Sequence, residues 1–175
     1  MALPRRNIEA KYRCDDLLAV LGRAKSLGAK DAGVVRQSDR FFEATFGRLK
    51  LRQIGDGRAE LISYVRQDVA AAKGSDYCIY HTAAPEELAG VLAHCLESRG
   101  VVQKARTLLL WRNTRIHLDE VDGLGTFVEL ETVIHEQNEH SARDELKQIA
   151  GALVLSDEDL MSEAYIDLLA AAKST

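Results

Sequence analysis

The sequence lacks an excess of positive charge: 23 lysines and arginines stand against 27 aspartates and glutamates, for a net charge of −4. A protein that attracts nucleic acid or an anionic membrane through its overall electrostatic field is normally strongly basic. We therefore expect neither nucleic acid nor a membrane as a partner. Any anion that the protein binds must be held by a local cluster of basic side chains.

Cysteines and long apolar runs are also scarce. The three cysteines, Cys14, Cys78 and Cys95, are odd in number and far apart, which argues against a disulfide framework and against a zinc site. No apolar run approaches the roughly 20 residues of a membrane span, and the N-terminus has no apolar stretch of signal-peptide length. These absences favour a soluble, cytoplasmic protein.

The length of 175 residues suits one domain, and we expect 1–175 to fold as a single unit. Apolar side chains at helical spacing predict helices within 15–28, 85–100, 139–152 and 165–172. Alternating apolar and polar side chains predict eight strands at 7–13, 34–43, 48–54, 59–66, 76–82, 102–111, 114–121 and 126–134.

Turn signals join several of these strands, at Gly55-Asp56-Gly57, Asn113-Thr114 and Asp122-Gly123 with Gly125. Successive hairpins mean antiparallel pairing, and eight antiparallel strands can close into a barrel that leaves no exposed edge. The predicted fold class is therefore α+β, mostly β: a closed eight-stranded antiparallel β-barrel, or tunnel, with amphipathic helices packed outside.

Charge is confined to one face of most of these strands. Side chains alternate between the two faces of a strand, so Glu9 and Lys11 share one face while Ile8 and Ala10 share the other. If the barrel closes with helices outside, the charged faces point into the lumen, where water, opposite charges and a ligand must compensate them. An open sheet with one solvated face would give the same alternation, and this alternative stays open.

The charged positions fall into two groups. The basic group, suited to phosphate oxygens, comprises Lys11, Lys50, Arg52, Arg66, Lys104, Arg106 and Arg115. The acidic group, which offers the oxygen ligands that Mg²⁺ or Mn²⁺ takes, comprises Glu9, Asp119, Glu129 and Glu131. A polyphosphate with its metal ion would neutralise both groups at once. Three further polar residues on the charged faces could contribute to the site: Asn7, Glu60 and His117.

These same residues resemble a known family. The segment 7–11, Asn-Ile-Glu-Ala-Lys, resembles the E-x-E-x-K motif of the CYTH superfamily, the triphosphate tunnel metalloenzymes. The segment 115–119 reads R-x-H-x-D and is followed at matching distance by F-x-E-L-E at 127–131. Tyr-x-Asp-Leu-Leu at 165–169 resembles the C-terminal element of the family. The resemblance spans nearly the whole chain and is closest to the branch of class IV adenylyl cyclases.

The resemblance implies an eight-stranded tunnel and a divalent-metal-dependent enzyme acting on a triphosphate. The implied reaction is conversion of ATP to cyclic AMP and pyrophosphate. The alternatives are a triphosphatase for inorganic, thiamine or nucleoside triphosphate, and a non-catalytic nucleotide- or polyphosphate-binding protein. The resemblance also gives catalytic roles to Lys11, Arg115, Glu129 and Glu131, phosphate contacts to the basic group and metal ligation to the acidic group.

One position departs from the motif. Asn7 stands where the family has its first glutamate. An amide offers an oxygen without charge, so the site should bind a second metal ion more weakly. A homodimer is compatible with this interpretation.

Overall fold

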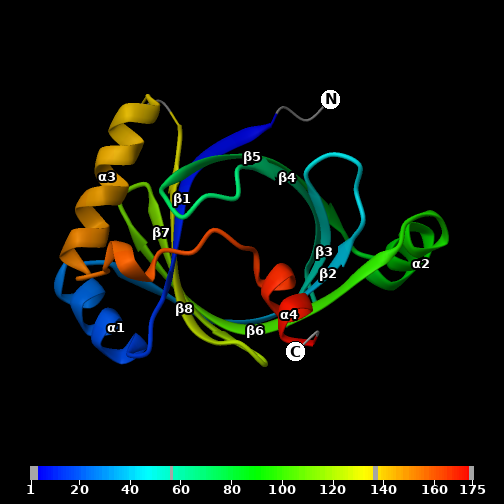
Figure 1. The fold of residues 1–175 in the computed structure, drawn as a ribbon, viewed down its shortest axis with the longest axis horizontal. Coiled ribbons are helices and arrows are strands. Elements are labelled where there is room, and N and C mark those ends of the chain that lie inside the picture. The colour runs from blue at the N-terminus through cyan, green and yellow to red at the C-terminus, as the bar shows by residue number, and fades with distance from the viewer. Residues whose placement is uncertain (1–3, 56, 136–137, 174–175) are drawn as a thin grey trace.

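The computed structural model describes residues 4–55, 57–135 and 138–173; Asp56, in one of the predicted turns, lies outside these ranges. Within them, eight antiparallel strands close into a barrel in the order β1-β5-β4-β3-β2-β6-β7-β8 (Figure 1). The strands are β1 (Arg5–Arg13), β2 (Lys30–Phe42), β3 (Arg48–Ile54), β4 (Ala59–Arg66), β5 (Lys73–Thr82), β6 (Ser98–Trp111), β7 (Thr114–Val121) and β8 (Gly125–Val133). The helices are α1 (Leu17–Ser26), α2 (Pro85–Cys95), α3 (Glu139–Ala152) and α4 (Tyr165–Lys173), with a 3-10 turn at Asp157–Asp159.

The predicted fold class is confirmed, and each predicted strand and helix is present with modest shifts of its ends. β5 starts earlier than predicted because Lys73 pairs in register with Glu9 on β1, which extends the ladder. α2 ends at Cys95 and not at Gly100, which lies inside β6 with φ of 125°. A Cβ at Gly100 would come within 3.3 Å of Ile166 on α4, so the glycine permits close packing of α4 there.

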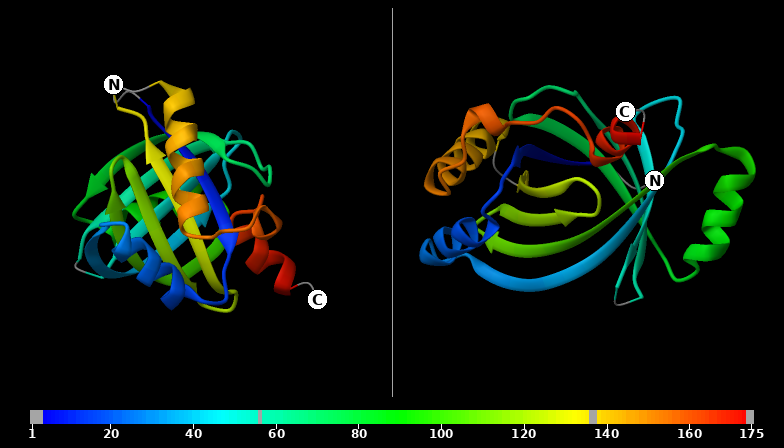
Figure 2. Two further views of the ribbon diagram at one scale, coloured as in Figure 1. Left: turned by 90° about the vertical axis from the view of Figure 1, so that its left-hand side faces the viewer. Right: turned by 60° about the horizontal axis from the view of Figure 1, so that its bottom comes forward.

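The apolar strand faces point outward and form the core with the helices. Ile8 and Ala10 of β1, together with Leu130 of β8, pack beneath Val20 of α1 and Leu146 of α3. These two helices lie on the same side of the barrel in both views (Figures 1 and 2). α2 packs near β3 and projects on the opposite side (Figure 1). With the apolar faces covered, the charged faces are left to line the interior.

Local signals explain where the two covering helices begin. The Asp16 carboxylate accepts a hydrogen bond from the backbone N–H of Ala19 at the start of α1. The Asn138 side chain does the same for Ser141 at the start of α3. Each cap satisfies an N–H group that has no partner within its helix.

The segment between α3 and α4, residues 153–164, passes across one end of the barrel, and we call it the strap (Figures 1 and 2). Its backbone is tied to β1, since the N–H of Met161 donates to the carbonyl of Lys11 over 2.9 Å. Farther along, Tyr165 enters the barrel and lines its interior. No helix among the described residues has the length and apolar character that a bilayer crossing requires.

Candidate active site

The barrel encloses a cavity of about 480 Å³, lined by side chains from every strand and by Tyr165. This volume lies within the range of small-molecule sites, about 300–1,000 Å³. The closed barrel excludes the open-sheet alternative. The cavity is lined by all the predicted site residues except Asp119, namely Asn7, Glu9, Lys11, Lys50, Arg52, Glu60, Arg66, Lys104, Arg106, Arg115, His117, Glu129 and Glu131.

Three of the basic side chains converge on Asp39 of β2, a carboxylate that the sequence analysis did not select. Lys50 and Lys104 donate to its Oδ2 over 3.0 and 3.2 Å. Arg52 contacts both oxygens, with Nε–Oδ1 and Nη2–Oδ2 distances of 2.7 and 2.8 Å. Asp39 is 1% exposed; burial acts to raise its pKa, but the three cations hold the pKa well below its ordinary value. Asp39 is therefore an internal counter-ion for these cations.

Two lysines of the lumen have pKa values below the ordinary value of a lysine. Burial, with repulsion from Arg52, lowers the pKa of Lys50 to about 7 although Asp39 opposes this shift. Burial likewise lowers the pKa of Lys11 to about 8 against the attraction of Glu129. A polyanion in the cavity would favour the charged form of both side chains. The electrostatics of the lumen therefore suit an added negative ligand.

Arg106 is held by two carboxylates. Its Nε and Nη2 each donate to Asp119 over 2.6 Å, and Nη2 also donates to Glu129 over 2.7 Å. The hydroxyl of Tyr165 donates to the same Asp119 over 3.0 Å, and burial raises the pKa of Tyr165 well above its ordinary value, so the hydroxyl keeps its proton. Asp119 is 0% exposed and lies behind Arg106. The structure places Asp119 where it orients Arg106, away from the cavity surface at which metal ligation was predicted.

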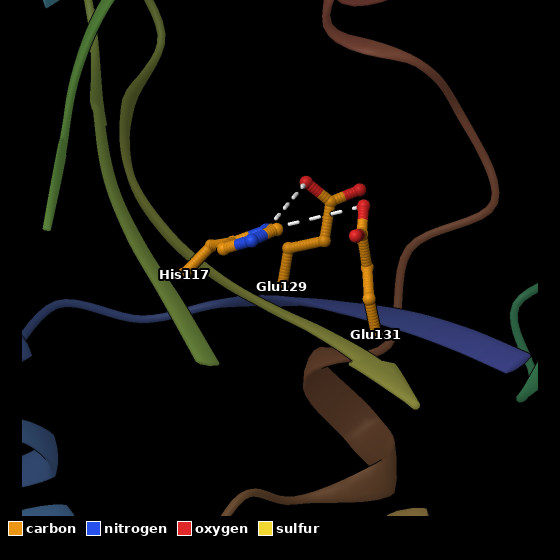
Figure 3. A group of neighbouring side chains, drawn as sticks. All are labelled: His117, Glu129 and Glu131. Atoms are coloured by element: carbon orange, nitrogen blue, oxygen red, sulfur yellow. Dashed lines mark ion pairs between the residues drawn. The ribbon is translucent and has the colours of Figure 1, made fainter. Parts of the chain in front are cut away.

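His117, Glu129 and Glu131 point toward one another inside the barrel (Figure 3). One potential ligand atom from each lies within 4.8 Å of the other two. The strand register produces this grouping, because His117 of β7 pairs directly with Glu129 of β8 and Glu131 lies two residues farther on the same face.

The donor set of this group fits a divalent cation. The Nδ1 of His117 lies 3.8 Å from Glu129 and 4.0 Å from Glu131, and within 4–55, 57–135 and 138–173 it has no hydrogen-bond partner. A buried nitrogen that faces two carboxylates at these distances can be satisfied as an imidazolium that pairs with them or as the ligand of a cation held between them. Carboxylates suit Mg²⁺ or Mn²⁺, and the imidazole nitrogen suits transition metals better.

The acidic residues differ in their tendency to ionise. Burial acts to raise the pKa of Glu129, but His117, Lys11 and Arg106 hold it well below its ordinary value. Burial and repulsion from Glu129 raise the pKa of Glu9, although Arg66 donates a hydrogen bond to its carboxylate. Glu129 is therefore the permanent anion of the group, whereas Glu9 holds its proton more readily.

Three further predicted residues line the cavity in different surroundings. Lys11 contacts the strap segment, with its Nζ 3.9 Å from the ring centroid of Tyr165 and 3.3 Å from the carbonyl of Glu163. Arg115 is more exposed, and its Nη1 lies 3.5 Å from Oε2 of Glu131. Asn7 is 4% exposed, and among the described residues its side-chain oxygen has no hydrogen-bond partner.

Sequence reasoning missed Asp39, although a signal was present. In the sequence, Gln37 and Asp39 share their parity with Val35 and Phe41, opposite Arg36, Ser38 and Arg40, and the structure buries Gln37 and Asp39. Applying the strand alternation to β2 would have placed Asp39 in the lumen. The contact of Tyr165 with Asp119 joins segments 46 residues apart and has no comparable local signal.

Several solved structures share this fold. The PH1012 protein of Pyrococcus horikoshii OT3 is 25% identical, with a TM-score of 0.83 over 93% of this chain and 98% of that one. A candidate adenylate cyclase of Vibrio parahaemolyticus is 22% identical, with a TM-score of 0.79 over 94% and 97% of the two chains. A candidate adenylyl cyclase of Hippeastrum, for which a dominant triphosphatase activity is described, is 12% identical, with a TM-score of 0.66 over 96% of each chain. At the last two levels of identity the likeness concerns the fold alone.

No curated protein matches the sequence. The family model of the CYTH domain matches residues 5–165, which include the complete barrel and Tyr165. This match covers most of the chain and agrees with the closed barrel and its charged lumen. The chain belongs to the CYTH domain family.

Proposed function

We propose that the protein is a divalent-metal-dependent enzyme that breaks a phosphoanhydride bond of a triphosphate bound in the barrel lumen. One observation carries the proposal: the seven basic residues of the predicted set line the same cavity as the group formed by His117, Glu129 and Glu131. Phosphoryl transfer needs little covalent chemistry from a protein, and it depends on positioning the phosphates and offsetting their charge. A cavity with these two groups of side chains supplies both.

Different basic residues would bind the phosphates in different ways. Lys50, Arg52 and Lys104 already bind the oxygens of one anion, Asp39, with charge-assisted hydrogen bonds. The guanidinium of Arg106 is fixed by Asp119, so it needs no reorganisation to contact a phosphoryl oxygen. These groups orient the triphosphate and stabilise charge on its bridging and terminal oxygens.

Glu129, Glu131 and His117 would hold the metal ion, with Glu9 beside them on β1. A bound divalent ion supplies Lewis-acid polarisation of a phosphoryl oxygen and offsets charge on the leaving group. In a cyclase reaction the ribose 3′ hydroxyl attacks the α-phosphorus of ATP and pyrophosphate leaves. In a triphosphatase reaction water attacks the terminal phosphorus, the diphosphate portion leaves with the bridging oxygen, and the attacked phosphoryl group becomes orthophosphate. Both reactions break one P–O–P bond and use the same bound triphosphate.

The test is incubation of the purified protein with ATP, thiamine triphosphate or tripolyphosphate, each with Mg²⁺ or Mn²⁺. Chromatography separates cyclic AMP and pyrophosphate from ADP and orthophosphate and so identifies the reaction. Glu129→Gln should abolish turnover, whereas Glu120→Gln, on the exposed face of β7, should leave it unchanged. Absence of product from all three substrates would refute the proposal.

Asn7 supports a second candidate, a binding protein without catalysis. Its amide is buried in the lumen where the family motif has a carboxylate, which removes one negative charge from the acidic side of the cavity. This candidate requires a saturable rise in Tm with tripolyphosphate and no product in the same incubations. Product formation excludes it.

A further inference from the structure

The acidic side chains of the lumen differ in whether the protein itself provides each of them with a cation. Glu129 and Glu131, together with His117, bring potential metal ligands within 4.8 Å of one another. Among the described residues Glu9 is not a member of this group, although it pairs in register with Glu131 on the neighbouring strand. The surroundings of Glu9 therefore need a separate account.

Glu9 is bound by an arginine that reaches it from two strands away. The Nη1 of Arg66, on β4, donates to Oε1 of Glu9, although β5 lies between β4 and β1 in the barrel. Ser75 of β5 pairs in register with Arg66, and its small side chain leaves room for the guanidinium to cross. The side chains of Arg66 and Glu9 are only 3% and 9% exposed. The contact is therefore a buried, charge-assisted ion pair inside the barrel.

Other charges around Glu9 decide whether a second cation would be stable there. Lys11 shares its strand and lumen face, and Lys73 pairs in register with it on β5; both attract its carboxylate. Glu129 repels Glu9, and a cation placed at Glu9 relieves this repulsion. Arg66 already provides that cation, and a divalent ion beside Glu9 would be repelled by three positive side chains.

The position two residues before Glu9 adds no negative charge. Asn7 lies on the same face of β1 and lines the cavity, and its amide is neutral. A divalent ion of the magnesium type needs several oxygen ligands, with one or two carboxylates among them. A single carboxylate that is already paired with an arginine does not meet this need.

A guanidinium can do part of what a metal ion does at a carboxylate. It has five N–H donors, so Arg66 can bind Glu9 and still donate to phosphoryl oxygens. Arg66 lines the cavity in which the triphosphate would lie. Unlike a metal ion, the guanidinium is part of the chain and does not exchange with solvent.

We propose that Arg66 is a fixed internal cation in place of a metal ion at Glu9, so that the lumen holds one divalent ion per chain, at His117, Glu129 and Glu131. This inference rests on the proposed function, since it takes the protein to use a divalent ion. It departs from the expected role of Glu9 as a metal ligand, and it gives Arg66 a role beyond phosphate binding.

Equilibrium dialysis against Mn²⁺ measures the number of bound ions and their affinity without any turnover. The wild type should bind one Mn²⁺ per chain. Arg66→Gln frees Glu9 from its partner and should bind two, whereas Arg66→Lys keeps a positive charge there and should bind one. Arg6→Gln is the matched control and should also bind one, because Arg6 forms its ion pair with Asp76 where both side chains are exposed.

The charge-balanced double variant, Glu9→Gln with Arg66→Gln, decides the question if circular dichroism shows that Arg66→Gln alone does not fold. It removes one charge of each sign and no ligand, so its Mn²⁺ affinity should stay within about threefold of wild type. A larger loss of affinity, two ions bound by the wild type, or one ion bound by folded Arg66→Gln would overturn the inference. Absence of Mn²⁺ binding by the wild type, with and without tripolyphosphate, would instead overturn the proposed metal-dependent function.

Discussion

Replacement of the internal counter-ion, Asp39→Asn, tests the electrostatic design of the lumen. The change leaves Lys50, Arg52 and Lys104 without their shared negative charge in a site that is 1% exposed at Asp39. Breaking a buried ion pair by removal of one partner costs about 3–5 kcal/mol. At about 2–4 °C per kcal/mol for a chain of this size, Tm should fall by about 6–20 °C.

Differential scanning calorimetry measures this change, and Asp76→Asn is the control. Asp76 also binds an arginine, Arg6, over 2.7 Å, but the side chains of the two are 42% and 48% exposed. Exposed pairs of this kind contribute about 0–1 kcal/mol, so the control should lower Tm by no more than about 4 °C. A drop for Asp39→Asn that is no larger than that of Asp76→Asn would refute the reasoning.

The same variant makes a prediction about ligand and pH. Since tripolyphosphate no longer competes with Asp39 for the three cations, it should raise the Tm of Asp39→Asn more than that of wild type. The pKa of Asp39 is depressed by folding, so its contribution is present above its ordinary pKa and is lost as pH falls. The difference in stability between the two proteins should therefore shrink below about pH 4. A constant difference from neutral to acid pH would contradict this account.

Three further changes probe other parts of the molecule. Burial lowers the pKa of Lys50 to about 7, so Lys50 loses its charge as pH rises and the affinity for tripolyphosphate should fall. In Lys50→Arg the charge is kept, so calorimetry should show a flatter dependence of affinity on pH. Equal slopes for the two proteins would argue against Lys50 as a phosphate contact. Arg106→Lys loses the two-point contact with Asp119 and should lower the unfolding free energy, measured in urea, by about 1.5–3 kcal/mol. An unchanged urea midpoint of unfolding would show that this contact does not stabilise the protein. Leu109 lies in the core outside the barrel, and Leu109→Ala should lower the unfolding free energy by about 2–5 kcal/mol. The affinity for tripolyphosphate should not change. An altered affinity in the folded protein would mean that core packing shapes the lumen.

The strand alternation predicted the division between lumen and core because the geometry of an extended chain fixes it. Glu9 and Lys11 line the cavity, while Ile8 and Ala10 lie in the core beneath the helices, as their parity indicates. This inference needs no knowledge of distant contacts. It therefore gave most of the charged residues that line the cavity together with the fold.

The contacts among these residues depend on register and packing that no local pattern specifies. Asp39 meets Arg52 and Lys104 only because β2 pairs in a particular register with β3 and β6. Asp119 has the parity of a lumen residue, yet its Oδ2 accepts hydrogen bonds from Arg106 and from the Tyr165 hydroxyl, and these two side chains cover it. The sequence could identify a charged lumen, whereas the partner of each charge required the three-dimensional structure.

The strap across the end of the barrel has a consequence for the passage of molecules. Carbonyl groups of Ser162 and Glu163 accept from Lys73 and Lys11, and the Tyr165 ring lies inside the same end. His81, at the other end of β5 from Lys73, lines the cavity and is exposed, so the rim there is open to solvent. Under the proposed function, a substrate that enters past this rim would place one end nearest Tyr165, and the fragment held there would depart last.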